Sequence, residues 1–310
     1  MEVLIIRPGA LGDTLMLAPA LTDLSAGMDV TFVGREPGLW FISPLVSRAL
    51  DMDRGGWHRL FTNRGDGQGL PVSEVDMAVA FLNDPDGIVR TNLKSFLPHA
   101  SVHIFRSLPS TGERVHVARY AARSLKSAGL PVDPERAMRA AVKGGSLGGQ
   151  YGPWGRRKSI VLHPGSGSPD KNHPPRFWID LFGVLSGETG PGDLEYVFLL
   201  GPAEESIRPC LEGRFRNGAV RGVSCPDREG LINTLCEAAV FLGHDSGITH
   251  LSAMLGTPTV ALFKKKNTAQ WAPLGPRVAI VRGKEPGPGL IERAVRASRR
   301  FLGIPGRGDL

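Results

Sequence analysis

Short apolar runs alternate with amphipathic stretches along most of the chain, with glycine or proline between them. In the first half, an apolar run at 3–6 leads into a glycine turn, a helical pattern over 14–24 and a second apolar run at 30–34. Apolar runs without a polar face are typical of strands that are buried on both sides of a parallel sheet. The succession of strand, turn, helix and strand therefore predicts a doubly wound α/β fold.

The same alternation predicts the elements that follow. The segment 55–69 has no periodicity and many glycines, so we expect a loop there. Further strands are expected at 76–81, 102–105, 159–163, 196–201, 219–223, 240–243, 259–263 and 278–281. Further helices are expected at 115–128, 176–186, 204–215, 228–238, 247–255 and 290–301.

The segment 130–157 predicts a crossing between two domains, because prolines and glycines interrupt the pattern throughout it. The expected domains are 1–145 and 146–310, each Rossmann-like and doubly wound, with a cleft between them. Ligands of open α/β sheets bind outside the carboxyl ends of the strands. Residues that follow strands are therefore the first candidates for chemistry.

Composition narrows the class of protein. A length of 310 residues suits two domains, and 41% hydrophobic with 22% charged residues is typical of a globular protein. The cysteines, Cys210, Cys225 and Cys236, lack metal-type spacing, so neither a disulfide framework nor a metal site is expected. A reducing cytoplasm fits this usage. No apolar run is long enough to span a bilayer, so any membrane association is expected to be peripheral.

The net charge of +7 indicates an anionic partner, such as a lipid surface, a phosphorylated substrate or nucleic acid. A surface that is simply basic is the plainer interpretation. The lysines and arginines are scattered, apart from one run at 264–266, and no RNA-binding signature or zinc finger accompanies them. Nucleic acid is therefore not the expected partner.

The first candidate cluster is Arg7-Pro-Gly-Ala-Leu-Gly-Asp13, which follows the first strand. Gly9 and Gly12 let the backbone approach a ligand closely, but they are too few for a dinucleotide fingerprint. Asp13 is either a functional carboxylate or merely the N-cap of the helix that follows. The spacing alone slightly favours the cap.

Two further clusters offer anion sites. His163-Pro-Gly-Ser166-Gly167 supplies backbone N–H groups with Lys171 close behind, although it lacks the order of a P-loop. Gly243-His-Asp245-Ser-Gly-Ile-Thr-His250 follows a strand and opens a helix, where free N–H groups attract anions. The alternative interpretation is structural: Asp245 or Ser246 is only the N-cap of the helix, and His250 faces the core. The combination of polar groups and a glycine favours a ligand.

A fourth cluster contains Glu204 and Glu205 at the end of another strand. A carboxylate there can accept hydrogen bonds from the two hydroxyls of a ribose. A solvated helix N-terminus explains the two glutamates equally well. Because several such clusters follow strands in the second half, together they indicate a nucleotide diphosphate site.

These motifs carry a family resemblance. The opening Leu-Ile-Ile-Arg-Pro-Gly-Ala-Leu-Gly-Asp-Thr-Leu at 4–15, with Pro-Ala-Leu at 19–21, resembles the N-terminal signature of glycosyltransferase family 9, which includes the ADP-heptose:lipopolysaccharide heptosyltransferases. The segments 163–171, 243–250, 255–263 and 271–276 extend the resemblance over almost the whole chain, in the family's order. The segment 34–112 contributes little to it.

The resemblance implies the GT-B architecture and an inverting, metal-independent transfer of a sugar, without any cofactor. It implies heptose as the sugar, ADP-heptose as the donor and a lipopolysaccharide core, an anionic glycolipid, as the acceptor. The N-terminal domain would bind the acceptor, with Asp13 as general base, and the C-terminal domain the donor; the last helix would pack back on the N-terminal domain. The implied donor-binding residues are Ser166, Gly167, Lys171, Glu204, Asp245, Ser246, Gly247 and His250, with Arg7, Gly9 and Gly12 on the acceptor side.

The sequence departs from the family pattern at one point, and two alternative functions stay open. Family members often have Gly-x-Thr-x-Pro after the strand that ends at Phe263, whereas 264–270 reads Lys-Lys-Lys-Asn-Thr-Ala-Gln, which leaves the donor sugar undecided. The lysines either contact acceptor phosphates or form a solvated run, and the solvated run is the default. The other functions are a non-hydrolysing nucleotide-sugar epimerase, which needs no acceptor, and a non-catalytic nucleotide or glycolipid binder, which needs no carboxylate at Asp13.

Overall fold

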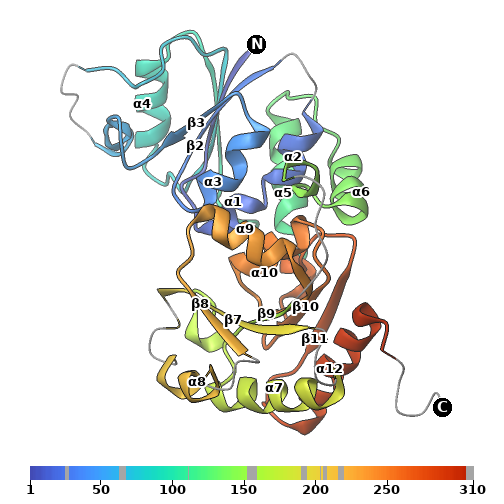
Figure 1. The fold of residues 1–310 in the computed structure, drawn as a ribbon. Coiled ribbons are helices and arrows are strands. Elements are labelled where there is room, and N and C mark those ends of the chain that lie inside the picture. Colours follow the sequence, from blue (N-terminus) through green and yellow to red (C-terminus); the bar gives the residue numbers. More distant parts are fainter. Residues whose placement is uncertain are drawn as a thin grey trace. The chain divides into compact units, whose positions relative to one another are not determined.

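The computed structural model of the chain describes residues 1–24, 28–62, 68–110, 112–151, 159–189, 194–202, 204, 208–215 and 220–304. The chain divides into an N-terminal unit, Met1–Ala140, and a C-terminal unit, Ala141–Leu310. Each unit is built on its own parallel sheet (Figure 1). In each sheet the central strands are buried along nearly their whole length, as the unbroken apolar runs predict.

The sheet of the N-terminal unit has five strands in the order β3-β2-β1-β4-β5. All neighbouring strands are parallel. The strands are β1 (Glu2–Ile6), β2 (Asp29–Gly34), β3 (Arg48–Asp51), β4 (Met77–Phe81) and β5 (Ser101–Phe105). The strand order reverses between β1 and β4, which is where a doubly wound sheet opens a crevice for ligands.

Helices cover both faces of this sheet: α4 lies on one face, and α1, α2, α3 and α5 lie on the other (Figure 1). The helices are α1 (Leu11–Leu15), α2 (Ala18–Asp23), α3 (Gly38–Ile42), α4 (Ile88–Phe96), α5 (Val117–Ser127) and α6 (Pro134–Gly144), with 3₁₀ turns η1 (Ser43–Leu45) and η2 (Trp57–Phe61).

The sheet of the C-terminal unit has six parallel strands in the order β11-β10-β9-β6-β7-β8. They are β6 (Ser159–His163), β7 (Glu195–Leu200), β8 (Val220–Ser224), β9 (Ala238–His244), β10 (Thr259–Phe263) and β11 (Val278–Arg282). The strand order reverses between β6 and β9, so this unit has a switch point of the same kind.

The helices of the C-terminal unit also lie on both faces of their sheet (Figure 1). Side chains of α7, α8 and α12 share one apolar core with the central strands. The helices are α7 (Pro175–Thr189), α8 (Arg208–Phe215), α9 (Arg228–Cys236), α10 (Gly247–Met254), α11 (Thr268–Trp271) and α12 (Pro288–Leu302), with 3₁₀ turns η3 (Gly148–Gln150) and η4 (Pro169–Lys171). The predicted packing of α12 on the N-terminal domain concerns the placement of one unit relative to the other and stays a prediction.

Of the helix expected at 204–215, the structure describes α8 from Arg208 onward, and residues 205–207 lie outside the described residues. Three other predicted segments differ from the structure. The helix expected at 14–24 is two short helices, because Pro19 in the first turn of α2 has no N–H to continue the first helix. The loop expected at 55–69 contains η2. The linker expected at 130–157 contains α6, which begins at Pro134, a favoured first residue of a helix. The carboxylate of Asp133 accepts hydrogen bonds from the first backbone N–H groups of α6.

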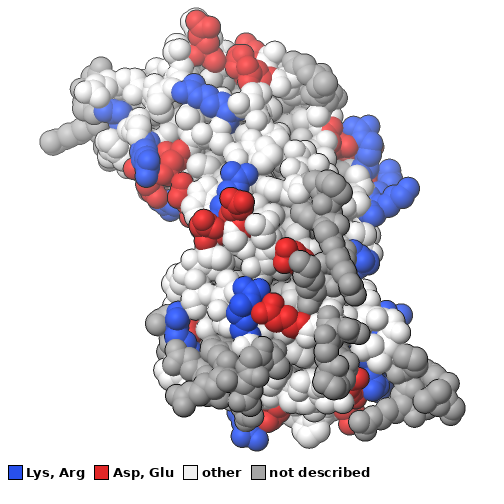
Figure 2. Space-filling model, in the orientation of Figure 1, with Lys and Arg blue, Asp and Glu red and all other residues white. Residues whose placement is uncertain are grey.

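On the face drawn in Figure 2, Lys and Arg side chains lie interspersed with Asp and Glu, so the positive charge is not gathered there in a single patch. Within the described ranges, none of the helices combines the length and apolar character that crossing a membrane requires.

Candidate functional site

In the N-terminal unit the candidate site begins with Arg7, directly after β1. The side chain is 2% exposed, and its guanidinium lies over the ring of Phe81, 5.4 Å from the centroid. Its Nε donates to the backbone oxygen of Asp13 at 2.8 Å, and Nη1 donates to the backbone oxygen of Ser107 at 2.9 Å. Burial lowers the pKa of Arg7, and the Asp13 carboxylate opposes that shift. The remaining nitrogen, Nη2, has no partner among the described residues.

Asp13 is not a helix cap. The N-cap of α1 is Ala10, and Asp13 is the third residue of the helix. Its carboxylate makes no hydrogen bond or ion pair within the part of the chain that the structure describes, and it lines a pocket of about 180 Å³ together with Arg7 and Ser107. A Cβ at Gly9 would lie 2.6 Å from the Cβ of Asp13, so this approach needs glycine. Gly12 lies in the first turn of α1, beside Asp13.

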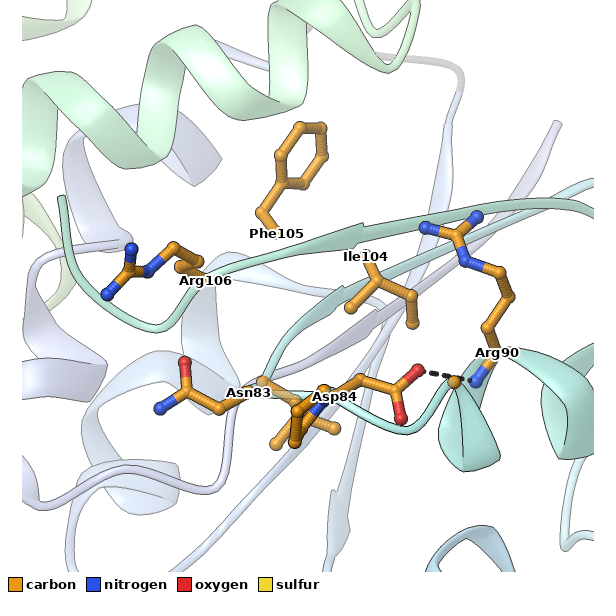
Figure 3. Close-up of a pocket in the computed structure, with 9 residues that line it drawn as sticks. Asn83, Asp84, Arg90, Ile104, Phe105 and Arg106 are labelled. Carbon is orange, nitrogen blue, oxygen red and sulfur yellow. Dashed lines mark hydrogen bonds between the residues drawn. The ribbon is translucent and has the colours of Figure 1, made fainter. Parts of the chain in front are cut away.

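A larger pocket opens at the same edge of this sheet, after β4 and β5. Its volume is about 420 Å³. Figure 3 shows Arg90 and Arg106 on opposite sides of Ile104. The Asp84 carboxylate accepts hydrogen bonds from the backbone N–H groups of Val89 and Arg90, both at 3.0 Å, in the first turn of α4. Leu82 lines both this pocket and that of Asp13, so the two are adjacent.

In the C-terminal unit, the loops after β6, β9 and β10 meet at Asp245. Its carboxylate is 4% exposed and lies 2.8 Å from Lys171 Nζ. Asn267 Nδ2 donates to the same oxygen, Oδ2, at 3.0 Å. Burial acts to raise the pKa of Asp245, but the polar groups around its carboxylate outweigh burial and lower that pKa to about 2. Asp245 is therefore a fixed anion that keeps Lys171 in place.

The helix start after Asp245 combines a cap and a core residue. Ser246 is the N-cap of α10, and its Oγ accepts from the N–H of Thr249 at 3.3 Å. Gly247 follows as the first residue of the helix. His250 is 2% exposed, and its Nε2 lies 3.7 Å from Asp245 Oδ1, too far for a hydrogen bond. The plain interpretations of Ser246 and His250 thus hold structurally, although both side chains border the Lys171–Asp245 pair.

The loop after β6 is held by its own side chains. Ser166 Oγ donates to Asn172 Oδ1 at 2.6 Å, which closes the loop that carries Lys171. Gly167 is exposed, with no atom within 4 Å of a Cβ built on it. Glu204 is 2% exposed, and its Oε2 accepts from the N–H of Gly201 at 2.6 Å. Glu205 lies outside the described residues.

The lysine run is not simply solvated. Lys264 Nζ donates to the backbone oxygen of Asn172 at 3.2 Å. Lys265 Nζ lies 3.0 Å from Asp170 Oδ2. These two lysines therefore connect the loop after β10 to the loop that carries Lys171, which corrects the default interpretation of the run. Lys266 is exposed and makes no such contact with the described residues.

Buried histidines lie beneath this site. His244 is fully buried, its Nε2 accepts from the backbone N–H of His173 at 2.9 Å, and its ring meets that of Trp178 edge-on. Burial, with the neighbouring histidines and Lys264, lowers the pKa of His244 to about 3. His163 Nδ1 donates to the backbone oxygen of Leu199 at 2.9 Å, and burial lowers its pKa as well. Both rings are neutral structural groups at neutral pH.

Sequence reasoning missed Asn267 and the pocket of Arg90 and Arg106. Asn267 follows β10, the neighbour of β9, so sheet order was the signal that could have placed it beside Asp245. Among the residues that the structure describes, no group of three or more His, Cys, Asp or Glu side chains is arranged to hold a metal ion.

Two doubly wound parallel sheets, each with polar residues at its switch point, define a two-domain α/β protein of the GT-B type. The family model described as glycosyltransferase family 9 (heptosyltransferase) matches residues 88–291, about two thirds of the chain. The chain therefore belongs to glycosyltransferase family 9 and is a glycosyltransferase. The predicted family and fold class are confirmed.

Solved structures of low sequence identity share this fold. E. coli heptosyltransferase WaaC with ADP matches with a TM-score of 0.64 and 18% identity, over 98% of this chain and 99% of that one. E. coli ADP-heptose lps heptosyltransferase II matches with a TM-score of 0.66 and 17% identity, over 97% of this chain and 98% of that one. A family 9 glycosyl transferase from Veillonella parvula matches with a TM-score of 0.67 and 16% identity, over 98% of each chain. The search of curated proteins found no match to this chain.

Proposed function

We propose that this glycosyltransferase moves heptose from ADP-heptose to the core of a lipopolysaccharide, with inversion and without a metal ion. The observation that carries the proposal is the Asp13 carboxylate: it caps no helix, makes no hydrogen bond or ion pair with the described residues and lines a pocket beside a buried arginine. The family supports sugar transfer, and the structure of WaaC with ADP supports an adenine nucleotide donor.

The proposal assigns the acceptor to the N-terminal unit. The Asp13 carboxylate takes the proton of the acceptor hydroxyl as that oxygen bonds to the anomeric carbon, while the bond from this carbon to the diphosphate breaks. Attack from the face opposite the leaving group inverts the anomeric centre. Arg7 fixes the backbone of Asp13, and its unpartnered Nη2 offers a hydrogen bond to an anionic acceptor. The family match begins at residue 88, so the role of Asp13 rests on its motif and its geometry.

The proposal assigns the donor to the C-terminal unit. Lys171, 28% exposed and oriented by Asp245, supplies a positive charge to the diphosphate. The backbone N–H groups at the start of α10 offer further donors. Together they stabilise the negative charge that develops on the leaving ADP, which is the work a metal ion does elsewhere. The proposal also assigns a ribose contact to Glu204 or Glu205. Glu204 Oε2 already accepts a hydrogen bond from the N–H of Gly201, so a ribose hydroxyl would have to bond to the same oxygen or replace this N–H.

The test is a transfer assay with purified protein, ADP-heptose and a lipopolysaccharide core that lacks heptose, read by mass spectrometry of the acceptor. We expect the mass of one heptose to be added, with EDTA present or absent. UDP-, GDP- and dTDP-sugars serve as matched donor controls. Epimerised nucleotide sugar without acceptor would support an epimerase, and donor binding without any turnover would support a non-catalytic binder. Either result contradicts the proposal.

A further inference from the structure

A further groove of the C-terminal unit lies between β11 and α12, and none of its lining residues belongs to the candidate donor site. Its volume is about 550 Å³. β11 is the last strand of the six-stranded sheet, and α12 runs beside it (Figure 1). All residues of β11, Val278–Arg282, line one wall, and one face of α12 lines the other with Arg293, Arg296, Ala297, Arg300 and Phe301.

Among the described residues, the outer edge of β11 is open for backbone hydrogen bonds, except at the Arg282 carbonyl, to which Arg293 Nη2 donates. Arg277 and Gly283, which flank the strand, bond to β10 at 2.8 and 3.0 Å. In a parallel pair, alternate residues bond to the same neighbour. The residues between, Val278, Ile280 and Arg282, therefore turn their N–H groups to the free edge. Proline and charged side chains usually protect such edges from pairing with another chain; β11 contains no proline, and its one charged residue, Arg282, donates from its side chain to the Thr268 hydroxyl.

The charge of the groove has one sign. Four arginines line it, and no carboxylate does so among the described residues. Arg282 Nη2 donates to the Thr268 hydroxyl, and Arg293 Nη2 donates to the Arg282 backbone oxygen at 3.1 Å. Arg296 and Arg300 are exposed and form no ion pair within the described part of the chain, so their charge is available to a partner. Between the arginines the floor is apolar.

That floor is built from small and aromatic side chains. Ala279, Ala297 and Phe301 are partly buried and pack against the core of the C-terminal unit. Ile280, on the opposite side of the strand, is 38% exposed. An added strand would thus meet apolar surface on each side of the sheet edge and arginines along the helix.

We propose that this groove docks an extended acidic segment of another protein, which adds as a strand to the free edge of β11. Strand addition beside a helix satisfies the open backbone groups, and glutamate or aspartate side chains of the segment pair with Arg296 and Arg300. A second copy of this chain fits poorly, because two identical arginine rows would face each other. A flat lipid surface offers no backbone to the strand. The docking surface is separate from sugar transfer and does not depend on it.

The probe is a fluorescein-labelled peptide of about eight residues in which glutamate alternates with valine, long enough to span β11. Binding to the full chain is followed by fluorescence anisotropy at physiological salt. We expect saturable binding that Arg296→Glu/Arg300→Glu weakens by about tenfold or more. The matched control is Arg139→Glu/Lys143→Glu on α6, which changes the net charge by the same amount at exposed positions and should bind the peptide as the wild type does.

Two further measurements separate strand addition from simple charge attraction. The same peptide with alternate amides N-methylated keeps its charge but loses edge hydrogen bonds, so its affinity should fall by about tenfold or more. Hydrogen exchange should slow at the amides of Val278, Ile280 and Arg282 when the unmodified peptide binds. Failure of the unmodified peptide to bind, equal binding of the methylated peptide, or equal binding by vesicles of phosphatidylglycerol or by oligo-dT would overturn the proposal.

Discussion

Asp13 in the N-terminal unit and Asp245 in the C-terminal unit both follow a strand at the switch point of a doubly wound sheet. Their surroundings differ. Asp245 is buried and held by Lys171 and Asn267; burial acts to raise its pKa, but the neighbouring His250, Lys171 and Asn267 lower that pKa to about 2. The Asp13 carboxylate has no ion pair among the described residues and lines a pocket. The fold places a carboxylate at both positions, but the neighbouring loops decide whether it faces a pocket without an ion pair or holds a lysine in place.

The largest expected effect comes from Asp13→Asn. Asparagine keeps the size of the side chain but cannot accept a proton at neutral pH, so transfer should fall on the order of 10²–10⁴-fold. ADP affinity and thermal stability should stay close to those of the wild type, because the Asp13 carboxylate makes no hydrogen bond or ion pair with the described residues and the backbone contact with Arg7 is kept. Initial rates of heptose transfer and calorimetric titration with ADP check both parts. Near-normal transfer by this variant would end the general-base proposal.

Asp245→Asn is the counterpart in the C-terminal unit and should behave in the opposite way. It removes the charge that holds Lys171 and leaves that lysine without its charged partner. We therefore expect ADP affinity to fall along with the transfer rate, rather than the rate alone. If both aspartate variants lost turnover but kept the ADP affinity of the wild type, Asp245 would not act through the donor-binding lysine, and the contrast between the two aspartates would be wrong.

Acid should destabilise the C-terminal unit through its buried histidines. The pKa of His244 lies at about 3 in the folded chain, below its ordinary value of 6.5. The unfolded chain binds this proton below pH 6.5 and the folded chain does not, so stability falls as the pH drops from 6.5 towards 3. The loss from this one group is on the order of 4–5 kcal/mol over the whole window.

Urea unfolding at pH 7, 6, 5 and 4 measures this loss. His244→Gln keeps an acceptor for the His173 N–H but does not titrate in this range. Between pH 6 and pH 4, the free energy of unfolding of the variant should therefore fall less steeply than that of the wild type, with a difference of about 1.4 kcal/mol per pH unit. Trp178, whose ring meets His244, offers a local fluorescence signal. Parallel curves for the two proteins would show that the ring is not held neutral.

Lys171→Ala tests the donor side directly. Losing a charge-assisted hydrogen bond to the diphosphate costs about 1.5–3 kcal/mol, which corresponds to roughly a ten- to hundredfold weaker affinity for ADP. Lys266→Ala, in the same basic region but exposed, is the control and should bind ADP normally. Equal ADP affinity in Lys171→Ala and the wild type would place the diphosphate elsewhere.

The sequence predicted the apolar strands well, because a strand buried on both faces must be apolar at every position, as β6 and β10 are. It missed β3, an edge strand whose residues are exposed or only partly buried. It failed where a proline suited a helix start, as in α6, since the same residue also marks linkers. It found Lys171 and Asp245 by motif. Their pairing follows from the adjacency of β6, β9 and β10 in the sheet, which no local pattern encodes.

The smallest expected effect concerns the contact between the loops of the donor side. Lys265 pairs with Asp170, but both side chains are largely exposed, at 48% and 72%. Solvent and salt screen such a pair, so Lys265→Ala should weaken ADP binding by no more than about threefold. Lys264→Ala should have a larger effect, because its Nζ donates to the backbone of Asn172, next to Lys171. Calorimetric titrations at low and high salt distinguish the two: the effect of Lys265→Ala should vanish at high salt, and that of Lys264→Ala should persist. If both lysine variants bound ADP as the wild type does, the loop that carries Lys171 would hold its position through Ser166 and Asn172 alone.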